Sequence, residues 1–278
     1  MEQIGGRAIH PINVRLGAST RCHKHDLEPL TEMLRHSLDD ALDTLRSVAE
    51  FDFPDVEFNH ELLSLADGER YPIENGTIKR SAGPSFDVAQ FSDHIIEAQV
   101  KHSTALHATL DGERYLTGPL ARYSLNSAVL SPIAREAAAA SGLGPVCRNP
   151  FRSILVRAVE VVYAIEESLR IITDYERPRP FVDVPARAGV GHGVSEAPRG
   201  LLYHRYEISD DNLIRSATIV PPTAQNQAAI EHEMAQLVAT NLSLDDATLT
   251  SLCEKWIRNH DPCISCSAHF LTLTIDRK

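Results

Sequence analysis

The sequence predicts a mainly α-helical chain with small β-hairpin elements, which is an α+β fold class. Two long segments, residues 26–50 and 149–172, carry apolar residues at steps of three and four, the spacing of amphipathic helices. Two shorter segments, residues 201–208 and 213–220, flank the turn-forming stretch 209–212 and predict a hairpin with a four-residue loop. No linker or low-complexity stretch interrupts the chain, so we expect a single domain over residues 1–278.

The first helix is expected to begin with Asp26 as its N-cap, to hold Pro29 in its first turn and to end near Glu50. Residues 59–65 predict a second, less regular helix. The following region, to about residue 120, favours strands and irregular structure. In it, Asn75-Gly76 lies between the apolar runs 71–73 and 77–79 and predicts a tight hairpin. Residues 93–100 suit a strand or a short helix.

The second half opens with an alanine-rich helix over residues 134–140, stopped by Gly142 and Gly144. Asn149-Pro150 then starts a helix that is apolar around so much of its circumference that we expect it to be central. A glycine- and proline-rich loop is predicted for residues 177–200. After the hairpin, two further helices are expected, at 230–239 and 243–257.

Charge and cysteine content restrict the class of protein. Twenty-seven basic and 38 acidic residues give a formal charge of −11, which argues against a general binder of nucleic acid or anionic membranes. No apolar run reaches the roughly 20 residues of a membrane span, and the N-terminus has no signal-peptide core. The five cysteines are odd in number and mostly dispersed, so a reducing cytoplasm fits best.

The strongest chemical motif is Asp261-Pro262-Cys263-Ile264-Ser265-Cys266-Ser267-Ala268-His269 near the C-terminus. Two thiols and an imidazole at three-residue spacing are typical metal ligands. The other cysteines are single, so three local ligands leave the site open or completed by another segment. A chance pair of buried cysteines and a redox disulfide are the alternatives.

Two other stretches are candidate ligand sites. Glycines flank Pro198-Arg199, so a guanidinium held near the backbone could donate hydrogen bonds to an anionic or polar ligand. The alternative is a surface loop with an exposed arginine. The rigid stretch from Val220 to Asn226 offers the hydroxyl of Thr223 and two amides, and Thr223 could cap the next helix. The histidines, His102 and His107 among them, form no recognisable ligand pattern.

Taken together, these stretches resemble nickel–iron hydrogenase large (catalytic) subunits, most of all the cytoplasmic, bidirectional, nicotinamide-linked type. The terminal motif looks like the closing motif of that family, residues 196–200 resemble its arginine loop, and residues 220–226 resemble its proline turn. The stretches 5–11, 118–122 and 149–152 are similar to further family segments. The resemblance runs through the whole chain in the family's order and implies the C-terminal two-thirds of such a subunit, with the large-subunit fold N-terminally truncated.

The resemblance also implies roles for single residues. Cys263 would be a terminal nickel thiolate, and Cys266 would bridge nickel to an iron that carries cyanide and carbon monoxide. Pro198, Arg199 and Thr223 would surround those diatomic ligands. Arg199 would also help to split H2, with Asp261 holding its guanidinium. His269 and the backbone carbonyl of Ile219 would bind a magnesium ion.

The resemblance further implies partner proteins: an iron–sulfur small subunit that holds all the iron–sulfur clusters, diaphorase-type subunits leading to NAD(P), and a maturation protease. That protease would cut after His269 and remove residues 270–278. The family's other two nickel thiolates come from an N-terminal Cys-x-x-Cys, which this sequence lacks, since Cys22 is single. Four interpretations therefore remain open: a fragment, a split subunit whose first half is a separate polypeptide, a non-catalytic remnant that binds a partner, and a zinc-stabilised scaffold.

Overall fold

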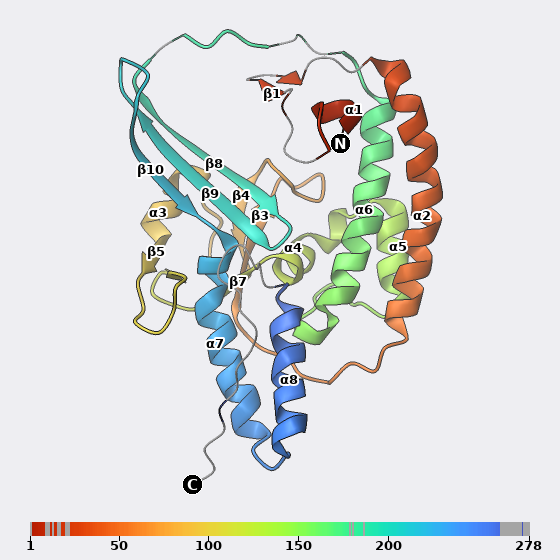
Figure 1. Ribbon diagram of the computed structural model, residues 1–278, viewed down its shortest axis with the longest axis vertical. Coiled ribbons are helices and arrows are strands. Elements are labelled where there is room, and N and C mark those ends of the chain that lie inside the picture. Colours follow the sequence, from red (N-terminus) through yellow and green to blue (C-terminus); the bar gives the residue numbers. More distant parts are fainter. Residues whose placement is uncertain are drawn as a thin grey trace.

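The computed structural model describes residues 2–8, 12, 14–15, 18–19, 23–177, 179, 181–185, 187–261 and 274. Its longer helices form two groups, with small sheets between them (Figure 1). The α-helices are α1 Glu2–Gly5, α2 Glu28–Ala49, α3 Phe91–His94, α4 Pro119–Asn126, α5 Pro132–Ala140, α6 Ser153–Thr173, α7 Pro222–Thr240 and α8 Asp246–Asn259. The strands are β1 Val14–Arg15, β2 Ala18–Ser19, β3 Glu61–Ala66, β4 Thr77–Arg80, β5 Ile95–Ala98, β6 His107–Leu110, β7 Tyr115–Thr117, β8 Gly189–Ala197, β9 Gly200–Ile208 and β10 Ile214–Val220.

Helix α6 is central to the first helical group, as its broad apolar surface predicted. It packs against α2 on one side and α5 on another. Val156, Val159 and Val162 are completely buried in the core that the three helices share. The side chain of Asn149 accepts a hydrogen bond from the amide of Phe151 at 2.9 Å, but this caps a 3-10 turn, Pro150–Arg152, and α6 itself starts at Ser153, a few residues after the predicted start.

The N-terminal end of α2 differs from the prediction. A 3-10 turn, Lys24–Leu27, precedes the helix, and Leu27 is the N-cap of α2. Asp26 lies inside that turn, where its carboxylate accepts a hydrogen bond from the amide of His23. The carboxylate therefore caps the short turn that leads into α2. The predicted end of the helix is confirmed, since the helix stops at Ala49.

The predicted helix at residues 59–65 is wrong, because this segment is strand β3. Leu62, Leu63 and Leu65 are all buried, which suits a strand covered on both faces, and such a strand shows no alternating pattern. β3 is the middle strand of a sheet, antiparallel to β4 and parallel to β7. Tertiary pairing with β7, which lies about fifty residues later in the sequence, decided this structure.

The predicted hairpin at residues 71–79 is also wrong. β4 does form at Thr77–Arg80, but its antiparallel partner is β3, and residues 71–73 are not a strand. Gly76 has φ +131°, and a Cβ there would lie 2.4 Å from the carbonyl oxygen of Ala66. The Asn-Gly turn therefore brings β4 back onto β3. Residues 91–98 form the short helix α3 followed by the strand β5, so both forms expected near 93–100 occur.

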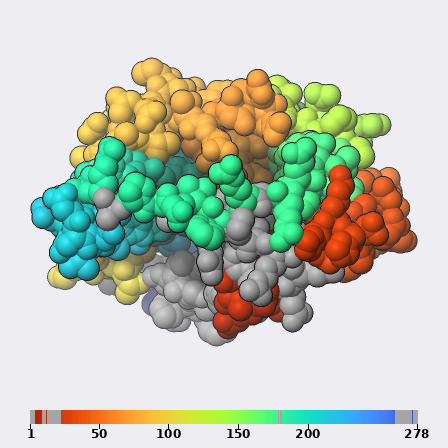
Figure 2. All heavy atoms as spheres, turned by 90° about the horizontal axis from the view of Figure 1, so that it is seen from above, coloured from red at the N-terminus to blue at the C-terminus, as the bar shows by residue number. Residues whose placement is uncertain are grey.

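The predicted loop at residues 177–200 contains a long strand. β8 pairs with β9 in full antiparallel register from Gly189↔Ile208 to Ala197↔Gly200, and β9 pairs with β10. The glycine-rich sequence hid this strand, because glycine is unfavourable in strands unless pairing stabilises it. The connection between α6 and β8 crosses one face of the molecule, from the helical group to the projecting β8–β10 sheet (Figure 2).

The second helical group consists of α7 and α8, which lie side by side below the sheets (Figure 1). Helix α7 starts at Pro222, eight residues before the predicted helix, and its N-cap is Pro221. Thr223 therefore lies in the first turn of α7, and the prediction that it caps this helix is wrong. A small core holds the two helices against the turn that precedes α6. It consists of Leu237 of α7, Trp256 of α8 and Phe151 of that turn. None of the helices in the described ranges is both long and apolar enough to cross a bilayer.

Candidate active site

Pro198 and Arg199 form the two-residue turn between β8 and β9. This turn packs directly against the Thr117-Gly118 backbone. A Cβ on Gly118 would lie 2.5 Å from the carbonyl oxygen of Arg199, and a Cβ on Gly200 would lie 2.5 Å from Cγ2 of Thr117. Both glycines have positive φ. Only glycine allows the two backbones to approach so closely, and this contact fixes the position of the arginine turn.

A buried ion-pair network holds β8 just before that turn. Arg122, on α4, donates from Nη1 to Glu196 Oε2 at 2.7 Å and from Nε to Glu160 Oε1 at 2.7 Å. The same guanidinium reaches the carbonyl oxygens of Ala197 at 3.1 Å and Pro198 at 3.4 Å. One buried arginine therefore ties α4, α6 and the end of β8 together.

The charges in this network compensate one another. Burial by itself lowers the pKa of Arg122, but Glu160 and Glu196 more than offset this effect and raise it well above its ordinary value. Burial raises the pKa of the Glu196 carboxyl, and Arg122 and the amide of Leu65 offset part of that rise. The amide of Leu65 donates to Glu196 Oε1 at 2.7 Å. Each charge is buried with a partner, as buried ions require.

The guanidinium of Arg199 has a different environment, because its partner is Asp261 at the end of α8. Nε donates to the backbone oxygen of Asp261 at 2.5 Å, and Nη2 lies 3.4 Å from Asp261 Oδ2. Arg157 on α6 also approaches this carboxylate, at 4.0 Å. About a third of the Arg199 side chain, 35%, stays exposed. Nη1 of Arg199 donates no hydrogen bond within the part of the chain that the structure describes.

The start of α7 supports the same turn through its two amide side chains. Gln225 donates to the carbonyl of Leu201 at 2.6 Å. Asn226 accepts from the amide of Thr117 at 2.9 Å and donates to the carbonyl of Arg199 at 3.3 Å. These two side chains connect α7 to both backbones at the glycine contact. Thr223 is half-buried and lies two residues before Gln225.

A second buried polar group lies beside Asp261. Glu233 of α7 is fully buried, and its carboxylate lies 3.0 Å from Nε2 of His60 and 3.6 Å from Nε2 of His260. Burial lowers the pKa of His260 to about 3, with a further contribution from Arg157. Burial also raises the pKa of Glu233. Because His260 directly precedes Asp261, this cluster fixes the chain where it enters the terminal motif.

The predicted site residues fall into three groups. In the first group, Arg199 is paired with Asp261, which is the contact that the prediction for Asp261 requires. Pro198 and Thr223 lie in the two segments on either side of this pair. Ile219 is in β10, paired with His204, and its side chain is 48% exposed. The third group lies outside the residues that the structure describes: Cys263, Cys266, His269, the segment 270–278 except residue 274, and also Cys22.

The sequence did not reveal the residues that hold the Pro198-Arg199 turn in place. Arg122 and Glu196 lie in motifs that we singled out, but nothing in the sequence pairs them. Arg157 and Glu160 interrupt the most apolar helix of the chain, and charged residues within such a surface are the available signal for buried ion pairs. Gln225 and Asn226 were noted only as amides in a turn.

The fold is that of hydrogenase large subunits. Residues 160–269 match the family model described as nickel-dependent hydrogenase. The structure superimposes on that of an NAD+-reducing [NiFe]-hydrogenase in the H2-reduced state with a TM-score of 0.77 and 24% identity, covering 96% of this chain and 65% of that one. A [NiFeSe]-hydrogenase from Dm. baculatum gives a TM-score of 0.68 at 16% identity, covering 96% and 65% of the two chains. The predicted fold class is thereby confirmed.

The sequence is similar to subunits of nickel-dependent hydrogenases over nearly its whole length. It is 31% identical to sulfhydrogenase 1 subunit alpha of Pyrococcus furiosus, over 98% of this chain and 65% of that protein. It is 25% identical to the NAD-reducing hydrogenase HoxS subunit beta of Cupriavidus necator, over 79% of this chain and 46% of that protein. The chain thus spans less than two thirds of the length of these relatives.

Proposed function

We propose that this chain is the C-terminal part of the catalytic subunit of a hydrogenase that interconverts H2 with protons and electrons. The observation that carries the proposal is the pair formed by Arg199 and Asp261. The guanidinium of Arg199 is held by Asp261 along one edge and is partly exposed. Cys263 follows Asp261 by two residues in the sequence. A fixed cation next to a pair of thiolates suits a centre with anionic ligands.

The donor set fits a nickel–iron centre. Soft thiolates favour such metals over magnesium or calcium, so Cys263 would serve as a terminal nickel ligand and Cys266 as the bridge to iron. When bound, the centre would supply Lewis acidity towards H2, with cyanide and carbon monoxide on the iron. The backbone at Pro198, the guanidinium of Arg199 and the hydroxyl of Thr223 would surround the diatomic ligands.

Arg199 would act beside the reacting hydrogen. Its Nε and Nη2 are engaged by Asp261, so Nη1 would face the hydrogen. There the guanidinium would stabilise the developing charge while a cysteine thiolate takes the proton, or Arg199 would take it after first giving up its own proton. Asp261 fixes the orientation of the guanidinium, and Arg157 approaches Asp261 from the other side at 4.0 Å. The positions of both groups are set before substrate binds, which is what electrostatic preorganisation requires. A magnesium ion would be bound by His269 and the carbonyl of Ile219.

The chain contains only one Cys-x-x-Cys motif, so two further nickel thiolates would come from residues outside these 278. An iron–sulfur small subunit would carry electrons away. The likeness to the NAD-reducing hydrogenase of Cupriavidus necator supports diaphorase-type subunits and NAD(P) as the route onward. We further propose a cytoplasmic location, a single domain over residues 1–278 and a maturation protease that removes residues 270–278.

The test is to co-express the chain with a polypeptide that supplies the first Cys-x-x-Cys and with the small subunit. Nickel content and H2 uptake are then measured for the wild type and for Cys263→Ser. We expect the substitution to lower nickel occupancy and to abolish H2 uptake. Cys253→Ser is the matched control, because Cys253 is buried in α8 and should affect neither. Undiminished nickel and H2 uptake in Cys263→Ser would contradict the proposal.

The absence of a second Cys-x-x-Cys favours one alternative, a non-catalytic relative that retains the fold and binds a partner. In that case the wild-type assembly would form with the small subunit, yet hold no nickel and take up no H2. The same measurements therefore separate the two functions.

A further inference from the structure

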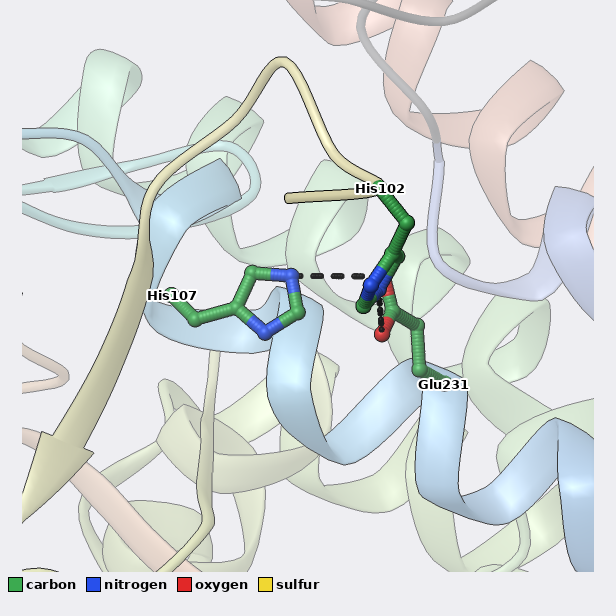
Figure 3. A group of neighbouring side chains, drawn as sticks. All are labelled: His102, His107 and Glu231. Carbon is green, nitrogen blue, oxygen red and sulfur yellow. Dashed lines mark hydrogen bonds and ion pairs between the residues drawn. The ribbon is translucent and has the colours of Figure 1, made fainter. Parts of the chain in front are cut away.

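A second group of metal-type donors lies away from the arginine turn. His102 lies in the loop that joins β5 to β6, His107 is the first residue of β6, and Glu231 projects from α7 (Figure 3). One donor atom from each residue can be chosen so that all three lie within 4.8 Å of one another. Two imidazoles and one carboxylate form the ligand set of many zinc sites and of non-haem iron sites.

The donor atoms are close enough together for one ion. Nε2 of His102 lies 2.9 Å from Glu231 Oε2, and Nε2 of His107 lies 3.3 Å from Glu231 Oε1. Donors placed about 2.0–2.1 Å from a tetrahedral zinc ion are roughly 3.3 Å apart. Small side-chain shifts would therefore bring the three donors, which lie within 4.8 Å of one another, around an ion.

The environment of His107 is a second and independent indication. Its side chain is 10% exposed, and its Nε2 is buried without a hydrogen-bond partner among the described residues, although it points towards Glu231. A buried polar nitrogen without a partner costs free energy. A cation bound by this nitrogen and by Glu231 removes that cost.

The carboxylate is oriented for this role. Gln227, one turn earlier on α7, donates to Glu231 Oε1 at 3.0 Å. A supporting hydrogen bond to a ligating carboxylate is a regular feature of metal sites.

We propose that His102, His107 and Glu231 bind one divalent first-row transition metal ion, distinct from the nickel–iron and magnesium ions of the proposed function. Water fills the remaining coordination position, because His102 is 68% exposed and Glu231 is 35% exposed. The ion clips the β5–β6 loop to α7. This helix also carries Gln225 and Asn226, which hold the arginine turn, so the ion stabilises the helix that supports that turn.

The experiment uses the full 278-residue chain with Cys263 and Cys266 replaced by serine, so that thiolates do not bind the probe. After treatment with a chelator, Zn²⁺ is titrated by calorimetry and the thermal midpoint is recorded. We expect one equivalent to bind and the midpoint to rise by roughly 5–10 °C at about 100 times the Kd. Mg²⁺ should have no such effect, since it prefers oxygen donors.

His102→Ala and Glu231→Gln, each made in the same background, should weaken Zn²⁺ binding at least about 100-fold and abolish the rise in midpoint. His102 is exposed, so its variant should fold normally, with an unchanged midpoint in the presence of chelator. His36→Ala is the matched control, because His36 is also exposed and contacts only a backbone oxygen of its own helix. Equal Zn²⁺ binding by all the variants, or an equal response to Mg²⁺, would overturn the proposal.

Discussion

Two arginines at the β8–β9 turn, one on α4 that reaches the backbone leading into the turn and one in the turn itself, have opposite environments. Arg122 is 6% exposed and binds two carboxylates and the carbonyls that lead into the turn. Arg199, in the turn itself, is 35% exposed and binds a single aspartate with one edge. The comparison shows how the fold separates two tasks: a fully paired cation fixes the backbone, and a partly paired cation remains available for chemistry.

The difference follows from the free-energy cost of burying charge. A guanidinium that has lost its hydration needs nearly all its donors satisfied by the protein, so Arg122 has none left for a ligand. Arg199 keeps part of its hydration and needs fewer protein partners. Its orientation still comes from the rigid frame that Arg122 and the two glycines maintain. Substitutions should therefore affect stability at one arginine and activity at the other.

The largest effect is expected for Arg122→Met. Removing the guanidinium leaves Glu160 and Glu196 without their counter-charge inside the protein, which should lower the free energy of unfolding by about 3–5 kcal/mol. Urea unfolding of the full chain measures this change. Arg35→Gln is the control, because Arg35 forms an exposed pair with Glu32 and its loss should cost less than about 1 kcal/mol. Equal losses in the two variants would show that the network is not stabilising.

Arg199→Lys should reverse this pattern. Lysine keeps the charge but lacks the fork that contacts Asp261 with one edge, so we expect H2 uptake by the assembled enzyme to fall about 100-fold or more, with little change in urea stability. Asp261→Asn keeps the backbone contact and removes the counter-charge, which should give a smaller loss, about 10-fold. A stability loss in Arg199→Lys as large as that in Arg122→Met would remove the distinction between the two arginines.

Lowering the pH should destabilise the protein at His260, the residue that precedes Asp261. Burial lowers the pKa of His260 from 6.5 to about 3, so this imidazole is neutral in the folded chain, whereas the unfolded chain takes up a proton below about pH 6.5. The stability that His260 contributes is therefore lost as the pH falls from 6.5 towards 3, by at most about 1.4 kcal/mol per pH unit. His260→Gln should make the dependence of the urea midpoint on pH shallower in that window. An unchanged dependence would show that His260 is not buried neutral.

The sequence predicted the long helices well and several strands poorly. Helices α2 and α6 were found because their own residues carry the 3.6-residue period, α5 because its alanines favour a helix, and β9 and β10 because a short loop joins them. Strand β3 was missed because burial on both faces removes alternation, and β8 was missed because its glycines resemble a loop. In both cases a partner strand elsewhere in the chain decided the structure.

By itself the sequence determined the fold class and the resemblance to hydrogenase large subunits, since these depend on local motifs and their order. It also predicted Arg199, Asp261, Cys263 and Cys266 as the residues of the site. Only the tertiary structure decided which charged groups meet. The pairing of Arg122 with Glu160 and Glu196, and the convergence of His102, His107 and Glu231, join side chains from distant segments. Whether a charge is buried, paired or available depends on the whole fold, because desolvation is a property of the surroundings and not of the residue.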